Sequence, residues 1–264
     1  MTLKAVTLQG IRVHAMTEAE CVQHVLGELA AHRGGWVATL NVHYLRRLVG
    51  DPSFRTTCAP VNLAVADGMP LVWAGRLQGT PFPERVTGAS LVCSLAAAAA
   101  VAGRSLYLLG GASGVARAAA DVLQRRHSAI RIAGTLALPP DFEPDEGTLR
   151  PVADALALAS PDIVYVALGS PKQDRVIARL RATLPHTWWL GIGVALSFLT
   201  GDIPRAPEWM QEAGLEWFHR LATEPRRLAR RYLVDDLPFA ASLLLGAAVS
   251  RVAGFALLRR SPGQ

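Results

Sequence analysis

The chain has 264 residues, 51% of them hydrophobic, and this length allows one large α/β domain or a domain with an appendage. Lys and Arg outnumber Asp and Glu by 27 to 21, and the net charge of +6 favours anionic partners such as nucleic acid, phosphorylated metabolites or acidic lipids. The three cysteines are far apart without a CxxC pair, which argues against a disulfide framework or a zinc site and is consistent with a reducing cytosol.

The N-terminal segment carries a helix start but no targeting signal. It lacks a long apolar run followed by a small-residue cleavage site, so we expect no signal peptide. Thr17 and Glu20 have the spacing of a capping box, and apolar residues follow at helical intervals until Gly34. The sequence therefore predicts a first helix that begins just after Thr17.

Short apolar runs then alternate with amphipathic segments up to about residue 200. The predicted strands are 36–40, 61–65, 105–109, 130–135, 163–168 and 188–192, and the predicted helices lie near 42–49, 88–102, 114–126, 146–159 and 172–184. Continuously apolar strands separated by helices are typical of a parallel sheet covered on both faces. We therefore expect a doubly wound α/β domain over residues 1–203, with a loop at 138–147.

The composition changes from Pro204 onward, where no strand signal remains and short helical patterns are broken by proline and glycine. Five arginines crowd into a dozen residues with Glu224 as the only acid: Arg220, Arg226, Arg227, Arg230 and Arg231. A basic helical segment ahead of an apolar one is typical of a membrane-surface element. A solvated helical face with local ion pairs is the alternative interpretation. We treat residues 204–264 as a separate helical appendage.

Residues 237–258 are almost entirely apolar and are interrupted only by Arg251. A membrane-spanning helix needs about 20 apolar residues with few charges. Because Arg251 is charged and two glycines weaken the helix, we favour a peripheral, interfacial segment. A buried terminal helix or a contact in a homo-oligomer is the alternative.

Polar or glycine-rich residues follow most of the predicted strands. In an open parallel sheet, ligands bind beyond the carboxyl ends of the strands, so these residues are candidates for one site. They are Thr39 and Asn41 at the first of these strands, Asp67 and Gly68 at the second, Gly110 and Gly111 at the third, and Lys172 and Gln173 after the fifth.

Taken singly, each candidate also has a structural explanation. Asp67 and Gly68 could form only a turn, and Arg85 could make only a surface ion pair. The run 110–114 suits a phosphate at a helix N-terminus but is neither a Walker loop nor a complete GxGxxG. The seven histidines form no metal-ligand pattern, so we expect no bound metal. Together the residues favour group transfer from a phosphate-activated donor, with a carboxylate base and arginines on the phosphates.

Several motifs resemble the WecG/TagA/CpsF family of bacterial glycosyltransferases. They are ATLNVHYL, VADGMPLVWAGRLQGTPFPERVTG, LYLLGGASG, LGSPKQD, GDIPRAPEWM and GLEWFHRLATEPRRLARRY, in the family's order over residues 36 to 232. The resemblance implies a Rossmann-like fold and an inverting, metal-independent enzyme without a cofactor. It also implies transfer of a sugar from a UDP-sugar to a polyprenyl-diphosphate-linked saccharide. The expected location is the cytoplasmic face of the bacterial inner membrane, with no nucleic-acid partner.

The same resemblance implies roles for individual residues. Asp67 matches the aspartate that acts as general base, and Thr39 and Asn41 match residues lining its pocket. Arg85 matches the arginine of the ERVTG motif and is the candidate to bind the diphosphate. Gln173 matches the glutamine of the PKQ motif and is expected to contact the donor or acceptor sugar. The other expected substrate-binding residues are Gly110, Gly111, Lys172 and Arg205, with Arg220, Arg227 and Arg230 as phosphate contacts from the appendage.

The chain departs from the family's pattern at two positions. Asp174 stands where the family usually has Glu, which puts any direct contact of this carboxylate in doubt. Ser197 stands where many members have Asp, which leaves the donor open between glucose, N-acetylmannosamine and its uronic acid. The Ser-Phe sequence with the long apolar tail is nearer the exopolysaccharide glucosyltransferase branch.

Two other functions are compatible with parts of the sequence. A doubly wound sheet with glycine turns also suits an NAD-dependent oxidoreductase, although no complete GxGxxG follows the first predicted strand. A non-catalytic scaffold at the membrane surface would need only the basic tail.

Overall fold

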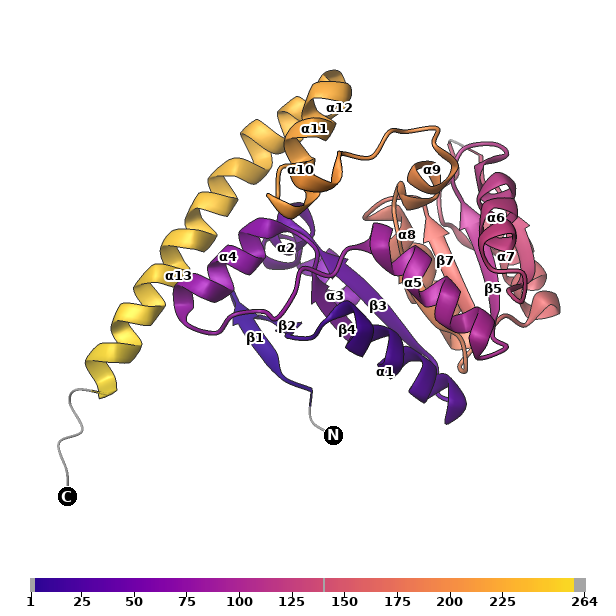
Figure 1. Cartoon of the computed structure of the whole chain (residues 1–264), viewed down its shortest axis with the longest axis horizontal. Coiled ribbons are helices and arrows are strands. Elements are labelled where there is room, and N and C mark those ends of the chain that lie inside the picture. Colours follow the sequence, from indigo (N-terminus) through magenta and orange to yellow (C-terminus); the bar gives the residue numbers. More distant parts are fainter. Residues whose placement is uncertain (1–2, 140, 259–264) are drawn as a thin grey trace.

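A computed structural model describes residues 3–139 and 141–258, with side chains as far as residue 252. Its centre is an eight-stranded sheet in the order β1-β2-β4-β3-β8-β7-β5-β6, and every strand pair except β1–β2 is parallel (Figure 1). The strands are β1 (Ala5–Leu8), β2 (Ile11–His14), β3 (Gly35–Leu40), β4 (Leu63–Ala66), β5 (Ser105–Gly110), β6 (Arg131–Leu136), β7 (Ile163–Ala167) and β8 (Trp188–Gly191).

Helices connect the strands and cover both faces of the sheet. Those before residue 204 are α1 (Glu18–Ala30), α2 (Val42–Gly50), α3 (Pro52–Cys58), α4 (Met69–Gln78), α5 (Gly88–Val101), α6 (Val115–Arg126), α7 (Glu146–Ala159), α8 (Lys172–Leu180), the 3-10 turn η1 (Arg181–Thr183) and α9 (Ala195–Thr200). One buried apolar cluster packs α1, α5, α6 and α9 on one face, and a second packs α2, α3, α7 and α8 on the other. The predicted α/β class with a mostly parallel, doubly wound sheet is confirmed.

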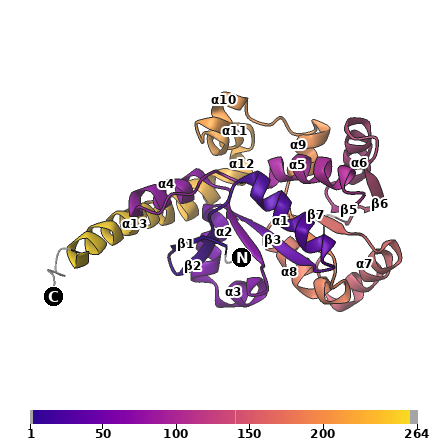
Figure 2. The ribbon, with the colours of Figure 1, turned by 60° about the horizontal axis from the view of Figure 1, so that its bottom comes forward.

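The C-terminal residues form helices only, as the loss of strand signals predicts. They are α10 (Glu208–Glu212), α11 (Glu216–Thr223), α12 (Pro225–Ala229), the π-helical segment η2 (Arg230–Asp236) and α13 (Leu237–Leu258). In Figure 1, α10 to α12 lie above α4, and α13 runs back along α4. Figure 2 shows α13 and α4 side by side again, with the end of α13 extending away from the sheet.

A buried carboxylate fixes the appendage to the α/β domain. Asp236, only 8% exposed at its side chain, lies 3.3 Å from His43 Nδ1, 3.1 Å from Arg46 Nε and 3.5 Å from Arg231 Nε. His43 and Arg46 belong to α2, so this cluster ties η2 to the helix that follows β3. Leu243 of α13 is also buried in the apolar cluster of that face.

The structure confirms all six predicted strands within two or three residues at their ends, and it confirms the capping box, in which Glu20 N–H donates to the Thr17 hydroxyl. The sequence reasoning missed the hairpin of β1 and β2, as well as α3, α4 and α9. In the hairpin, Gln9 and Gly10 form the turn with φ values of 49° and 77°. Such a turn matches the right-handed twist of the strands.

Candidate functional site

The carboxyl ends of β3, β4, β8, β7 and β5 meet at one edge of the sheet because these strands are parallel. β5 leads outward to β6, whereas β7 leads inward to β8. The loops after β5 and β7 therefore diverge at a topological switch point, where such sheets bind ligands. The candidate site has two parts: the ends of β3 and β4, and the loops at this switch point.

Asp67 follows β4 directly and is half-buried. The Gly88 N–H, at the start of α5, lies 3.4 Å from Asp67 Oδ2. Burial raises the pKa of Asp67, and the nearby Glu216 raises it further, while Arg85, the Gly88 N–H and the Thr39 hydroxyl lower it. A carboxylate whose pKa is raised is a stronger base and is suited to take a proton from a hydroxyl group.

Thr39 and Gly88 lie against each other beside Asp67. A Cβ atom on Gly88 would lie 3.2 Å from Thr39 Oγ1, so this glycine allows the first turn of α5 to approach the end of β3. The structure thus brings Thr39 and Asp67 together, as predicted.

Asn41 lies next to this group but has a structural role. Its Oδ1 accepts the Tyr44 N–H at 3.0 Å and caps α2. A Cβ on Gly68 would lie 3.3 Å from the Asn41 Cα, so the two strand-end loops are in contact. A contact of the Asn41 side chain with a substrate remains a prediction.

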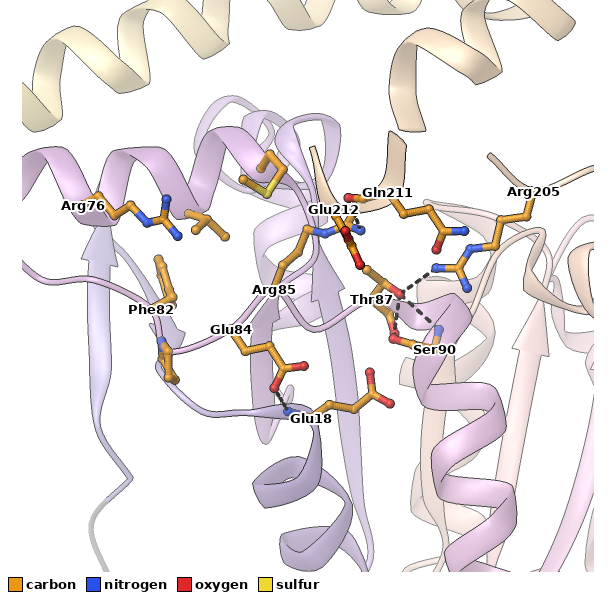
Figure 3. A pocket seen from close by; sticks show the side chains of 13 residues that line it. Glu18, Arg76, Phe82, Glu84, Arg85, Thr87, Ser90, Arg205, Gln211 and Glu212 are labelled. Carbon is orange, nitrogen blue, oxygen red and sulfur yellow. Dashed lines mark hydrogen bonds between the residues drawn. The ribbon is translucent and has the colours of Figure 1, made fainter. Parts of the chain in front are cut away.

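Arg85 and Arg205 line a hollow of about 430 Å³ between the α/β domain and α10 (Figure 3). Arg85 Nη2 donates to the Gln211 carbonyl at 3.0 Å, and Arg205 Nη2 lies 3.5 Å from Thr87 Oγ1. In Figure 3 the two arginines lie on either side of Thr87. Because Arg85 also lowers the pKa of Asp67, it connects this hollow with the carboxylate at the strand end.

Glu216, the first residue of α11, lies between these two arginines. Its Oε2 is 3.4 Å from Arg85 Nη1 and its Oε1 is 3.5 Å from Arg205 Nε. The side chain is 16% exposed. Sequence reasoning placed no role on Glu216, because its partner Arg85 is 131 positions away in the chain.

Gln173 is buried in the first turn of α8 and joins two strand-end loops. Its Oε1 accepts the N–H groups of Gly169 at 3.2 Å and Gly193 at 3.0 Å. A Cβ on Gly191 would lie 2.5 Å from Gln173 Nε2, so only glycine leaves room for this side chain. Gln173 therefore fixes the loops after β7 and β8, and its predicted contact with a sugar is not tested by this geometry.

The neighbours of Gln173 have different surroundings. Lys172 forms an ion pair with Glu143 at 3.2 Å. Asp174 is 1% exposed, and its Oδ1 accepts the Tyr44 hydroxyl at 2.8 Å. Burial raises the pKa of Asp174. This carboxyl therefore connects α8 to α2 behind the site. The sequence, with Asp174 where the family usually has Glu, had left the contacts of this side chain open.

Gly110 and Gly111 form the turn after β5 with φ values of 92° and 80°. A Cβ on Gly110 would lie 2.8 Å from Leu168 Cδ2, so the loop needs glycine for its backbone and for its close packing. α6 then begins after Gly114 without a side-chain cap. The Val115 N–H donates to the Ala112 carbonyl at 3.0 Å, and the amides of the next residues are left to another acceptor.

The three arginines predicted as phosphate contacts of the appendage differ in their partners. Arg220 lies 3.8 Å from Glu224 and 5.8 Å from the centre of the Phe198 ring, which places α11 against α9. Arg227 Nε donates to Glu224 at 2.6 Å, and Arg230 is exposed. Their contact with phosphate remains a prediction.

Within residues 3–139 and 141–258, no group of three or more His, Cys, Asp or Glu side chains is placed to hold a metal ion.

Comparison with known proteins shows what this chain is similar to. Residues 6–252 match the Glycosyl transferase WecG/TagA/CpsF family. The chain belongs to this family. This glycosyltransferase is 29% identical over 202 residues to the N-acetylglucosaminyldiphosphoundecaprenol N-acetyl-beta-D-mannosaminyltransferase of Bacillus spizizenii, covering 76% of each chain. It is 29% identical over 197 residues to the enzyme of the same name from Bacillus subtilis, covering 75% of each.

The match confirms the family that the motifs indicated and makes the protein an enzyme of glycosyl transfer, not an oxidoreductase or a non-catalytic scaffold. The residue roles carried over from the motifs remain predictions. The sequence analysis gave no role to two residues of the glycosyltransferase, Tyr44 and Glu216. Tyr44 connects α2 to α8, and Glu216 connects α11 to Arg85 and Arg205. Their partners are distant in sequence, so no local pattern marked them.

Proposed function

We propose that this glycosyltransferase transfers a sugar, with inversion, from a UDP-sugar to a saccharide linked to polyprenyl diphosphate, in the synthesis of a cell-surface polysaccharide. The observation that carries the proposal is the half-buried Asp67 at the end of β4, in electrostatic contact with Arg85 beside a hollow lined by two arginines. The names of both relatives describe transfer to a sugar on a diphosphoundecaprenol lipid.

Asp67 is the general base of the proposed reaction. It takes the proton from the attacking hydroxyl of the acceptor, and the hydroxyl oxygen forms the new bond to the anomeric carbon of the donor. The bond between that carbon and UDP breaks, and UDP leaves with the electron pair. One displacement inverts the anomeric carbon and needs only one base.

The donor and acceptor have separate surroundings in this proposal. The UDP group occupies the switch point, where the turn of Gly110 and Gly111 lets the backbone come close and the uncapped start of α6 presents backbone amides to phosphate. Gln173 fixes the neighbouring loops there. The acceptor diphosphate lies on the side of Arg85 and Arg205, with the appendage arginines as further candidates. Lys172, the first residue of α8, is a further candidate on the donor side.

We also propose that the appendage holds the enzyme peripherally on the cytoplasmic face of the bacterial inner membrane. Among the described residues, one continuous helix, Pro225–Val252, is long and apolar enough to cross a membrane, and 17% of its most apolar stretch is buried. Leu237, Leu245 and Val249 are exposed at intervals of four or eight residues, so they share one face of α13. A helix with one face on protein and an apolar face open suits the membrane surface better than a span.

The test of the reaction is transfer in vitro. Purified full-length enzyme is incubated with a short-chain polyprenyl-diphosphate N-acetylglucosamine and, in separate samples, UDP-glucose, UDP-N-acetylmannosamine or its uronic acid. Mass spectrometry is expected to show one hexose-type residue added to the lipid with one of these donors. Hydrolysis of the UDP-sugar without any gain in lipid mass would refute the proposal.

The test of the membrane role is sedimentation with vesicles. Full-length enzyme should sediment with vesicles that contain phosphatidylglycerol, and the chain ending at residue 203 should remain in the supernatant. Vesicles of phosphatidylcholine alone control for charge. Equal sedimentation of the truncated chain would contradict the role of the appendage.

A further inference from the structure

The contacts around Glu216 show a carboxylate held where an anionic ligand would bind. Each of its two oxygens meets a different arginine, at 3.4 Å for Arg85 and 3.5 Å for Arg205. The three residues come from distant parts of the chain: the loop before α5, the loop after α9, and the start of α11. Two guanidinium groups that converge on one pair of oxygens form the arrangement that binds a phosphate or diphosphate.

The two arginines do not depend on Glu216 alone for their positions. Arg85 is also held by the Gln211 carbonyl at 3.0 Å, and Arg205 lies near the Thr87 hydroxyl. The contacts of Glu216 are single and long, whereas a strong pair of arginine and carboxylate is bidentate and shorter. The carboxylate can therefore be replaced while the guanidinium groups stay close to their present places.

The local charges favour such a replacement. Arg85 and Arg205 carry two positive charges, and Glu216 and Asp67 carry up to two negative ones, so the group is close to neutral without a ligand. A diphosphate brings about two further negative charges. If Glu216 stayed in place, the ligand would meet two carboxylates beside the two arginines. Withdrawal of Glu216 would change the sum of these charges, with the ligand bound and Asp67 ionised, from about −2 to about −1.

We propose that Glu216 is an internal anion that occupies the diphosphate position between Arg85 and Arg205 and leaves them when a diphosphate binds. This inference rests on the proposed function, which assigns these two arginines to a substrate diphosphate. Because Glu216 is the first residue of α11, its release changes how α11 docks on the α/β domain. The affinity for diphosphate is thereby lower than the two arginines alone would give, and it is coupled to the position of the appendage.

Titration of inorganic pyrophosphate into the full chain, followed by calorimetry at low ionic strength, tests the proposal without any turnover. Glu216→Gln should bind pyrophosphate about fivefold more tightly than wild type, the effect expected when two weak, partly exposed ion pairs no longer compete. Glu216→Asp keeps the charge but shortens the reach, and it should also bind more tightly. Thermal melting of each variant shows that it is folded.

Glu212→Gln is the matched control, because Glu212 lines the hollow together with Arg85 and Arg205, and its replacement changes the net charge equally. It should raise the affinity by less than half the effect of Glu216→Gln. Equal gains in both variants would show a general charge effect and overturn the inference, as would weaker or unchanged binding by both Glu216 variants.

Arg85→Gln separates this inference from the proposed function. Pyrophosphate binding that is lost in Arg85→Gln but is not strengthened in the Glu216 variants overturns the role of Glu216 alone. Binding that does not depend on Arg85, or no binding in any variant, overturns the diphosphate assignment itself.

Discussion

Replacement of Asp67 by Asn is the most direct test of the chemistry. The change keeps the shape of the side chain and its contact with the Gly88 N–H at 3.4 Å through the amide oxygen, but removes the ability to accept a proton at neutral pH. General base catalysis contributes about 10² to 10⁴ in rate, so we expect kcat to fall about 10³-fold, equivalent to about 4 kcal/mol of transition-state stabilisation. The assay is transfer to the lipid acceptor under saturating donor.

The pH profile gives a second measure of the same residue. Burial raises the pKa of Asp67 above the ordinary value of 3.8, so wild-type kcat/KM should rise with pH on an acidic limb displaced upward from that value. Arg85 lowers this pKa, and Arg85→Gln should therefore move the limb to higher pH. Asp67→Asn should lack the limb.

Asp121→Asn is the matched control, because it removes the same group from α6, where Asp121 forms one ion pair among the described residues, with Arg117 on the outer surface. It should retain full activity. If Asp67→Asn kept more than about a tenth of the wild-type rate, or kept the acidic limb, the smallest contribution of a general base would be missing and Asp67 could not be the base.

Three further outcomes follow from the contacts described. Gln173→Ala should lower stability by about 1–3 kcal/mol in denaturant titrations, because it leaves two loop N–H groups without their acceptor, and Gln173→Glu should recover part of this loss. Burial raises the pKa of Asp174, so the folded protein holds its proton more tightly than the unfolded chain, and ionisation costs stability as the pH rises above 3.8 and through the folded pKa. Asp174→Asn should therefore gain stability relative to wild type as the pH rises above 3.8, and a difference that does not change with pH would refute the sign. Leu245→Glu combined with Val249→Glu should reduce vesicle sedimentation severalfold without changing the melting temperature by more than a few degrees, whereas unchanged sedimentation would exclude this face of α13.

The central strands could be predicted because they are buried on both faces. Runs such as 106–109 and 163–167 are hydrophobic at every position, which marks them without an alignment. The β1–β2 hairpin is different. Buried and exposed residues alternate along β1, and both strands of the hairpin have only four residues. Periodicity over four residues is too short to identify a strand.

The candidate site could be predicted in part for a related reason. Residues that follow strands, such as Thr39 and Asp67, meet because the fold brings all carboxyl ends to one edge. The side-chain partners could not be predicted, because they depend on packing between distant segments. Gln173 is an example: the sequence suggested a side chain directed at a sugar, and the structure shows its carbonyl oxygen on two backbone amides.

The buried Asp236 also fixes the position of α13 relative to Asp67. It locks η2 onto α2 close to the N-terminal end of that helix, and the residue that caps the same end is Asn41, beside the carboxylate at the end of β4. α13 continues from η2 for 22 residues, about 33 Å of helix. A surface that receives α13 thus sets the height and tilt of Asp67 above the lipid headgroups. In the proposed membrane-bound state, a lipid-borne sugar would meet its base at one level above the bilayer, and the length of the linkage to the lipid would become part of what the enzyme selects.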